Sequence, residues 1–519
     1  MPISSRLLIQ SLAISLLLVL LIAAVFRLSR FPGLHADEAW MGLRALEIMQ
    51  KGFFSVHGMN RYSGAAFPGL LTVAFSTLGV NVFSLRLLGA LLNWAAIALM
   101  MATFWRRGNA AFYVALLFAS SLLFLFYSRV AWEVSALENF ALALIIFALS
   151  RLLSAGPPRS ENVFLFFSAF GFATWNHFIF LGAVLSFTIT ALFTFFRDPN
   201  SATARIVLLG TLNLVVPTLL YYGKPHLRDG DFINHAMPAL LTGVTLLLGI
   251  SLLFIAMDRR ISPSIALFLA AKRSLSRRFA LLLMCCLFAG LVYTFREHLM
   301  AFFGTLSGMI VRERVVSYVT EPVDSIPGLL WAAVLIGVFF VFLIRTTLYP
   351  APQDTLRCVL LVWPVAFLAI IHFIAPWSAD RYYLIPHFIF LVALALVVDE
   401  IPILWKRALG VVLIIGLIQG QFFFWSEVTK TENRRPIEVR FGPYYDDKSA
   451  HFLRLDRLEG FLRKKGVCEI DSSSYFILEP LKFLQKSHPL LCRRPGRVAR
   501  IEYCDSCQSS VPWFEITYQ

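Results

Sequence analysis

The sequence predicts a helical protein that crosses a membrane many times and ends in a small α+β domain outside the bilayer. Of its 519 residues, 58% are hydrophobic and only 15% are charged, whereas an average soluble domain has about 25% charged residues. The mean hydropathy is +0.72. Long apolar runs recur over residues 1–424, and from residue 425 the chain becomes polar and mixed. The two regions are therefore expected to be a transmembrane domain, 1–424, and a C-terminal domain, 425–519.

The apolar runs that are long enough to cross a bilayer set the number of predicted spans at about 13. They lie at residues 7–26, 83–104, 109–127, 134–153, 162–176, 178–196, 206–222, 238–257, 279–295, 328–346, 358–376, 383–398 and 408–424. Residues 68–81 are apolar but short and rich in Gly and Thr, so they are not counted. The first span has only Arg6 before it and no clear cleavage site after it, which favours a retained helix over a signal peptide.

Basic residues in the connectors predict the orientation. With the N-terminus inside, every inner connector carries at least two basic residues, as with Arg106 and Arg107, and this is the positive-inside pattern. The outer side then holds the loop after the first span, residues 128–133, 175–177, 221–238, 296–327 and 376–383, and the tail. The expected location is the inner (cell) membrane, with the tail extracytoplasmic. Topology thus accounts for much of the net charge of +15, and no nucleic-acid-binding pattern stands out.

Two adjacent carboxylates, Asp37 and Glu38, follow the first span and the turn at Pro32-Gly33. Residues 39–54 have the spacing of an amphipathic helix in the membrane interface. A pair of acids at this mouth of the protein is suited to act as a catalytic base and its helper. The structural alternative is that Asp37 is the N-cap of the helix, with Glu38 favoured by the helix dipole.

Three further outer segments carry candidate functional residues. Arg129 precedes Glu133, an arrangement that also fits an i, i+4 helix pair. His177 follows Trp175 and Asn176, which is also typical of an aromatic belt. Arg381 lies on the outer side against the topological bias, which indicates a bound anion. Further bases that would face a phosphate are Arg61, Lys224, His226, Arg228, Arg312 and Arg314.

The seven cysteines divide between the two regions. Cys285, Cys286 and Cys358 lie in predicted spans, where they pack as small apolar residues. The tail holds the other four, which are Cys468, Cys492, Cys504 and Cys507. In an oxidising compartment they favour two disulfides, with three pairings open. A zinc site is the alternative, because the last two have ligand spacing. Residues 452–465 of the tail are helix-like, and residues 475–478 and 511–518 are strand-like.

Four short sequence segments resemble segments of the membrane glycosyltransferases of the GT-C fold. The resemblance is nearest to the protein-mannosyltransferase superfamily, which includes the lipid A aminoarabinose transferases. The four segments are the D-E pair, LFLFYSRVAWEVSAL, WNHF and RYYLIP, within residues 5–400. The D-E loop is the specific one. Paired prolines common later in this loop are reduced here to Ala66-Phe67-Pro68, and the second-loop acid is usually Asp.

The resemblance implies transfer of a sugar from a polyprenyl-phosphate carrier to a lipid, glycan or protein acceptor at the outer face. By similarity, Asp37 and Glu133 are the acids of the first and second loops, with Glu138 a rival to Glu133. His177 matches a histidine of the third outer segment, and Arg381, with its neighbour Tyr382, is expected beside the carrier phosphate.

The expected chemistry is an inverting glycosyl transfer with a carboxylate general base. The sequence identifies no cofactor with certainty, and a divalent metal ion between Asp37 and the phosphate is left open. A lipid-linked sugar flippase or another transporter is the main alternative, although the sequence shows neither clearly embedded midplane acids nor clear inverted repeats. A non-catalytic envelope scaffold that binds through its tail is the third.

Overall fold

The computed structural model describes most of the bundle and parts of the C-terminal region. The described residues are 3–52, 63–107, 109–154, 159–198, 282–287, 325–348, 355–374, 380–429, 437–438, 451–452, 455–467, 469–487, 498–503 and 514–518, with single positions between 202 and 289. Several predictions lie outside these residues: those for Arg61, Lys224, His226, Arg228, Arg312, Arg314, the four tail cysteines, the spans 206–222 and 238–257, and most of 279–295.

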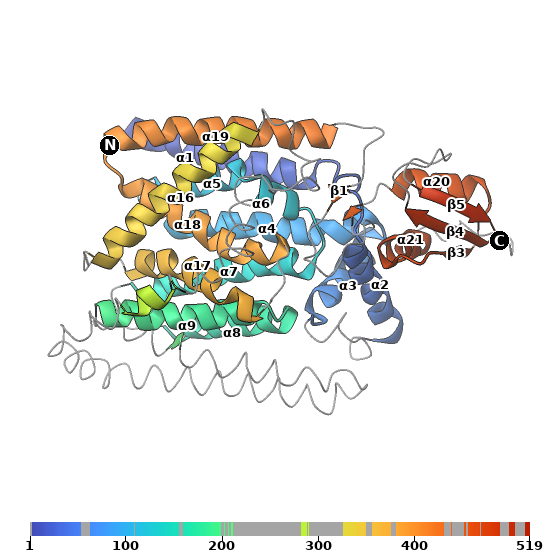
Figure 1. Ribbon diagram of the computed structural model, residues 1–519, viewed down its shortest axis with the longest axis horizontal. Coiled ribbons are helices and arrows are strands. Elements are labelled where there is room, and N and C mark those ends of the chain that lie inside the picture. Colours follow the sequence, from blue (N-terminus) through green and yellow to red (C-terminus); the bar gives the residue numbers. More distant parts are fainter. Residues whose placement is uncertain are drawn as a thin grey trace, which may run out of the picture.

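Long helices run side by side and form one bundle (Figure 1). They are α1 (Ile3–Val25), α4 (Val82–Phe104), α5 (Ala110–Ser120), α6 (Leu122–Tyr127), α7 (Glu133–Leu152), α8 (Ser160–Asn176), α9 (Phe180–Arg197), α16 (Ser325–Leu348), α17 (Thr355–Ile374), α18 (Leu384–Glu400) and α19 (Ile403–Thr429). Within the described part of the chain, six helices are long and apolar enough to cross a membrane. The chain is therefore an integral membrane protein with the predicted all-α polytopic fold.

The predicted span 109–127 is two helices, α5 and α6, which meet at Ser121. Ser121 has an extended backbone, and its hydroxyl accepts a hydrogen bond from the amide of Phe124, 3.1 Å away. Serine favours this N-cap position because its side chain satisfies an otherwise unpaired helical amide. The same hydroxyl lies 2.7 Å from Nε2 of His387 in α18, so the break fixes the chain against the neighbouring helix.

The apolar stretch that was not counted as a span forms α3 (Ala66–Leu78). Its 13 residues extend over about 20 Å, at 1.5 Å per residue. A bilayer core is about 30 Å thick, so α3 is too short to cross it.

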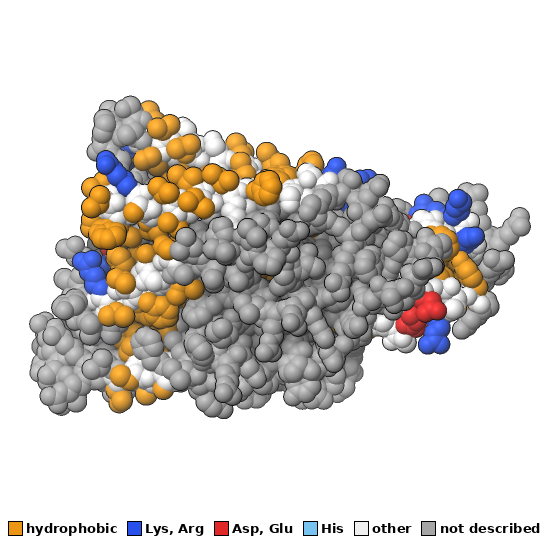
Figure 2. Space-filling view, turned by 45° about the horizontal axis from the view of Figure 1, so that its top comes forward, with side chains coloured by type: hydrophobic (Ala, Val, Ile, Leu, Met, Phe, Trp, Pro, Cys, Tyr) orange, Lys and Arg blue, Asp and Glu red, His pale blue; other side chains and the backbone are white. Residues whose placement is uncertain are grey.

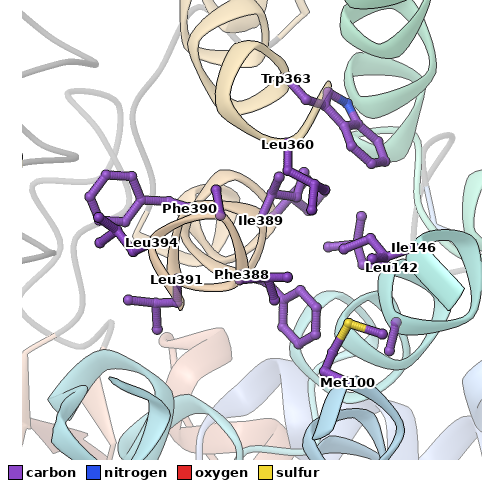
Figure 3. Packing of buried hydrophobic residues seen from close by; sticks show 14 of the residues in the cluster. Met100, Leu142, Ile146, Leu360, Trp363, Phe388, Ile389, Phe390, Leu391 and Leu394 are labelled. Carbon is purple, nitrogen blue, oxygen red and sulfur yellow. The ribbon is translucent and has the colours of Figure 1, made fainter. Parts of the chain in front are cut away.

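The centre of the bundle is α18. In its most apolar window 94% of the residues are buried, against 22% for α1 and 29% for α19. Figure 3 shows Phe388 and Ile389 of α18 among Met100 of α4, Ile146 of α7 and Leu360 of α17. The helix is apolar on every side because it meets protein on every side.

The outer helices present apolar side chains to the surroundings. Leu8 and Leu18 on α1 and Ile418 and Phe422 on α19 are all more than half exposed. Figure 2 shows a broad hydrophobic surface on the bundle with Lys and Arg at its edges. A surface of this kind suits contact with lipid and not with water.

The C-terminal region forms a small α+β unit, as the sequence predicts. It contains α20 (Leu455–Lys464), β3 (Glu469–Asp471), α21 (Tyr475–Ser487), β4 (Val498–Tyr503) and β5 (Phe514–Tyr518), preceded by the short pair β1 (Ile437–Glu438) and β2 (His451–Phe452). The sheet order is β3-β4-β5. Strands β3 and β4 are parallel, with Glu469 opposite Val498, whereas β4 and β5 are antiparallel. Helix α21 is the crossover that the parallel pair requires.

One prediction for this region is wrong. Residues 475–478, expected as a strand, are the first turn of α21. The aromatic and β-branched residues there favour a strand locally. However, the buried residues of this segment recur at helical spacing; they are Phe476, Ile477, Pro480, Leu481 and Leu484. Burial of this helical face outweighs the local strand preference, and the segment is a helix.

Helix α21 packs against α2 (Ala36–Lys51), at the end of the bundle where α2 and α3 lie (Figure 1). Met41 and Ala45 of α2 share a hydrophobic core with Ile477 and Phe483 of α21. A Cβ on Gly42 would overlap the Phe483 ring, so glycine allows this close approach. The apolar face expected to meet the membrane interface is thus partly covered by the C-terminal region.

Candidate active site

The N-terminus of α2 is built by a capping box. His35 is the N-cap: its Nδ1 accepts a hydrogen bond from the Asp37 amide at 3.1 Å. In return, the Glu38 carboxylate accepts one from the His35 amide at 3.2 Å. The alternative that Asp37 is the N-cap of this helix is therefore incorrect, because His35 is the N-cap. The carboxylate of Asp37 is left to face another part of the chain.

The Asp37 carboxylate faces Arg381, which lies in the 3-10 turn Asp380–Tyr383 that leads into α18. Its Nη1 donates to Oδ2 of Asp37 at 2.6 Å, and the two side chains are 13% and 7% exposed. The guanidinium carbon also lies 5.4 Å from the Trp132 ring centroid and 5.5 Å from that of Tyr382. Aromatic faces attract a cation, so two rings and one carboxylate fix Arg381 in a partly open position.

Glu38 is held very differently from its neighbour. Its two oxygens accept hydrogen bonds from Nε and Nη2 of Arg86 at 2.8 and 2.7 Å, and from the amide of Ala131 at 2.8 Å. Arg86 also donates to the carbonyl oxygens of Leu28, Pro32 and Gly33. Both side chains are fully buried. This pair ties the loop after α1 to α4 and to the segment before α7.

Arg86 was not identified from the sequence, although a signal was present. It lies within the apolar run 83–104, where an isolated charge is costly and requires a partner. This cost indicates that Arg86 has an acidic partner, and the structure identifies that partner as Glu38.

The ring of His35 connects this loop to two other regions. Nε1 of Trp132 donates to His35 Nδ1 at 3.3 Å, and the rings are T-shaped with centroids 4.9 Å apart. Phe476 of α21 approaches the same imidazole at 5.7 Å. Because Nδ1 accepts hydrogen bonds, the imidazole proton is on Nε2. His35 therefore joins the C-terminal region to the turn that carries Asp37.

The WNHF segment reaches the same area. His177 is buried, and its ring centroid lies 6.3 Å from that of Tyr382. Its Nδ1 accepts a hydrogen bond from the Ile179 amide at 3.2 Å. The preceding Asn176 donates to Oε1 of the buried Glu138 at 3.0 Å. The structure thus brings His177 and Tyr382 together beside Arg381, with Glu138 in contact with the same segment through Asn176.

The second outer loop divides into an anchor and a helix start. The buried Arg129 donates to the carbonyl oxygen of Ala23 in α1 and to those of Phe26 and Phe31 in the loop that follows it. Glu133 is the first residue of α7, and the position of its side chain lies outside the described structure.

The described residues do not bring together three His, Cys, Asp or Glu side chains as a metal site. Glu38 uses both oxygens on Arg86, His35 and Ala131. A divalent ion such as Mg²⁺ is typically held by one or two carboxylates together with water and substrate phosphate oxygens. Among the described residues of this loop, Asp37 is the carboxylate open to such an ion, because Glu38 is committed to its buried pair with Arg86.

The architecture defines a class of protein: the chain has the GT-C fold of membrane glycosyltransferases. The archaeal oligosaccharyltransferase AglB from Archaeoglobus fulgidus, solved with an inhibitory peptide and a dolichol-phosphate, matches 88% of this chain at a TM-score of 0.50 and 14% identity. The chain spans 58% of the length of that structure.

Two structures of ArnT from Cupriavidus metallidurans are also similar. The alignment with the apo form covers 75% of this chain and 77% of the ArnT chain, at 15% identity and a TM-score of 0.35. The form bound to undecaprenyl phosphate matches 96% and 94%, at 12% identity and a TM-score of 0.38. No family model and no curated protein matches the sequence. At 14% identity the match to AglB shows the fold alone.

Proposed function

We propose that this protein is a glycosyltransferase that moves a sugar from a polyprenyl-phosphate donor to an acceptor at the outer face of the membrane. The observation that carries the proposal is the pair formed by Asp37 and Arg381 within a GT-C fold. A carboxylate and a guanidinium that face one another at the end of a membrane bundle supply a proton acceptor and a phosphate-binding cation in one place. The dolichol-phosphate in the AglB structure supports a donor of this lipid class.

Arg381 is proposed to bind the donor phosphate. Its guanidinium is already orientated by Trp132 and Tyr382, and arginine matches the geometry of phosphate oxygens. A phosphate that binds there competes with Asp37 for the guanidinium. Donor binding would thus free the Asp37 carboxylate at the place where the sugar arrives, and His177 beside Tyr382 would line the same site.

The proposed reaction is a single displacement. The acceptor hydroxyl oxygen attacks the anomeric carbon, and the new C–O bond forms as the bond from that carbon to the phosphate oxygen breaks. Asp37 accepts the hydroxyl proton, and the polyprenyl phosphate leaves with the bonding electrons toward Arg381. Attack opposite the leaving group inverts the anomeric configuration. A positioned general base contributes about 10²–10⁴-fold to such a step.

Glu38 is proposed to position Asp37 and not to accept the proton itself. Its oxygens are occupied by Arg86, Ala131 and the His35 amide, which hold the first turn of α2 against α4. Glu133 stays a candidate for the second acid, with Glu138 as its rival. Arg381 is proposed to supply the positive charge that stabilises the departing phosphate.

The test is an Asp37→Asn variant reconstituted in vesicles with labelled polyprenyl-phosphate sugars and an extract of envelope acceptors. We expect transfer to fall by about 10²–10⁴-fold, while carrier-lipid binding persists. Glu47→Gln is the matched control, because Glu47 lies on the same helix and pairs with Arg44 and Lys51. Near-normal transfer by Asp37→Asn would refute the assignment, and labelled lipid that crosses the bilayer without being consumed would indicate a transporter.

A further inference from the structure

A groove of about 650 Å³ lies between α1, α4 and α7, far from Asp37. This volume is within the range of about 300–1,000 Å³ typical of ligand sites. Its apolar wall includes Ile14 and Leu17 of α1 and Ala98 and Met101 of α4. The wall suits a hydrocarbon chain.

Helix α4 shows where this groove lies relative to the membrane. Arg86, near the start of α4, binds Glu38 at the candidate active site, and Phe104 is the last residue of the same helix. At 1.5 Å per residue these positions are about 27 Å apart, close to the hydrocarbon thickness of about 30 Å. The groove beside the end of α4 therefore lies at the opposite membrane interface from the site.

The groove becomes basic where α4 and α7 end. Arg106, Arg107 and Arg151 line it and are exposed. Trp105 lies at the same level, and tryptophan favours the depth of lipid headgroups. Its apolar part lies along the spans and its three positive charges lie at their ends.

We propose that this groove binds an anionic phospholipid of the inner leaflet, with the headgroup phosphate on the arginines and an acyl chain along α1 and α4. The predicted orientation puts these arginines on the cytoplasmic side. Basic pockets between transmembrane helices on that side bind acidic lipids in this way. The phospholipid source is favoured over a free phosphate because of the apolar wall. The proposed phospholipid is also distinct from the polyprenyl-phosphate donor, whose phosphate is proposed to bind at the opposite membrane interface.

The test uses the full chain in nanodiscs of phosphatidylcholine with increasing fractions of brominated phosphatidylglycerol. Bromine quenches a nearby indole, so the signal assigned to the groove is the difference between the wild type and Trp105→Phe. In an Arg106→Gln/Arg107→Gln/Arg151→Gln variant, we expect the apparent affinity for phosphatidylglycerol to fall by about ten- to a hundredfold. Brominated phosphatidylcholine should quench weakly and equally in both proteins.

Two controls separate binding from folding and from net charge. The corresponding triple Arg→Lys variant keeps the charge and should retain most of the binding. Arg463→Gln/Lys464→Gln/Lys465→Gln removes the same charge from the last turn of α20 and the residue after it and should leave the Trp105 signal unchanged. The proposal is overturned if the groove variant is quenched like the wild type, if both lipids quench alike, or if inorganic phosphate alone displaces the brominated lipid.

Discussion

Nη1 of Arg381 lies 2.6 Å from Oδ2 of Asp37, although 344 residues separate the two in the sequence. The contact joins the start of helix α2 to the turn before α18, the most buried of the six described helices that are long and apolar enough to cross a membrane. The Asp37 carboxylate is thereby fixed to the centre of the bundle. The first predictions follow from this geometry.

Arg381→Ala should weaken binding of the carrier lipid. The variant loses charge-assisted hydrogen bonds to phosphate, each with a typical strength of about 1.5–3 kcal/mol, so we expect the Kd for a polyprenyl phosphate to rise by about 10–150-fold. Arg381→Lys should be intermediate, because it keeps the charge but not the planar donor geometry. Titration of the purified protein with a polyprenyl phosphate at several salt concentrations measures this. An unchanged Kd in both variants would remove the phosphate role of Arg381.

Glu38→Gln should lower stability much more than Asp37→Asn does. The Glu38 carboxylate and the Arg86 guanidinium are both fully buried, and loss of one partner from such a pair typically costs about 3–5 kcal/mol. Asp37 is buried, but its partner Arg381 is 13% exposed, so this pair is less enclosed and the same chemical change there should cost less. Thermal or denaturant unfolding in one detergent compares the two.

The combined variant Glu38→Gln/Arg86→Met provides the control for this pair. Since it leaves no uncompensated buried charge, we expect it to be more stable than Glu38→Gln alone. If the two single carboxylate variants are equally stable, the assignment of Glu38 to a structural role is wrong.

Phe476→Ala should disturb the turn that carries Asp37, although Phe476 belongs to the C-terminal region. Its ring is buried beside Ala36 and approaches His35 at 5.7 Å. Truncation of a buried Phe typically costs about 3–5 kcal/mol, and here part of that loss falls on the contact between α21 and α2. We expect faster hydrogen exchange at residues 34–38, measured by mass spectrometry on the full chain.

Two variants test whether this effect belongs to the His35 contact. Phe476→Leu keeps most of the apolar volume and should exchange nearly as slowly as the wild type. Tyr475→Ala changes the adjacent, exposed side chain of α21 and should leave residues 34–38 protected. Equal exchange in Phe476→Ala and the wild type would show that α21 does not stabilise the turn.

The helical part of this fold could be predicted because it depends on local composition. Runs of apolar residues located α4, α7, α9 and α18 to within about two residues at each end, since a bilayer demands length and hydrophobicity in one continuous segment. The break at Ser121 was missed for the same reason: a single capping residue does not change the hydropathy of the run 109–127.

The candidate site was predictable only in part. Asp37 and Arg381 stood out because each lies in a polar loop between apolar runs. That Glu38 pairs with Arg86, or that Phe476 contacts His35, depends on packing between distant segments. Such pairings are set by tertiary structure, which hydropathy and spacing do not encode.

The C-terminal region should lose local stability in acid through Glu502. Burial raises the pKa of this carboxyl, but hydrogen bonds from the amide and hydroxyl of Ser473 and from Arg500 outweigh burial and lower the pKa overall. A carboxyl with a lowered folded-state pKa stabilises the fold above its unfolded-state value, and this contribution is lost as the pH falls through the folded-state value. The Ser473 turn, between β3 and α21, should therefore open more often in acid.

Hydrogen exchange at residues 472–475 of the full chain, corrected for intrinsic rates, should show this loss of protection. Glu502→Gln should remove the pH dependence while leaving exchange in the bundle unchanged, and a wild-type turn with equal protection in acid and at neutral pH would contradict the prediction.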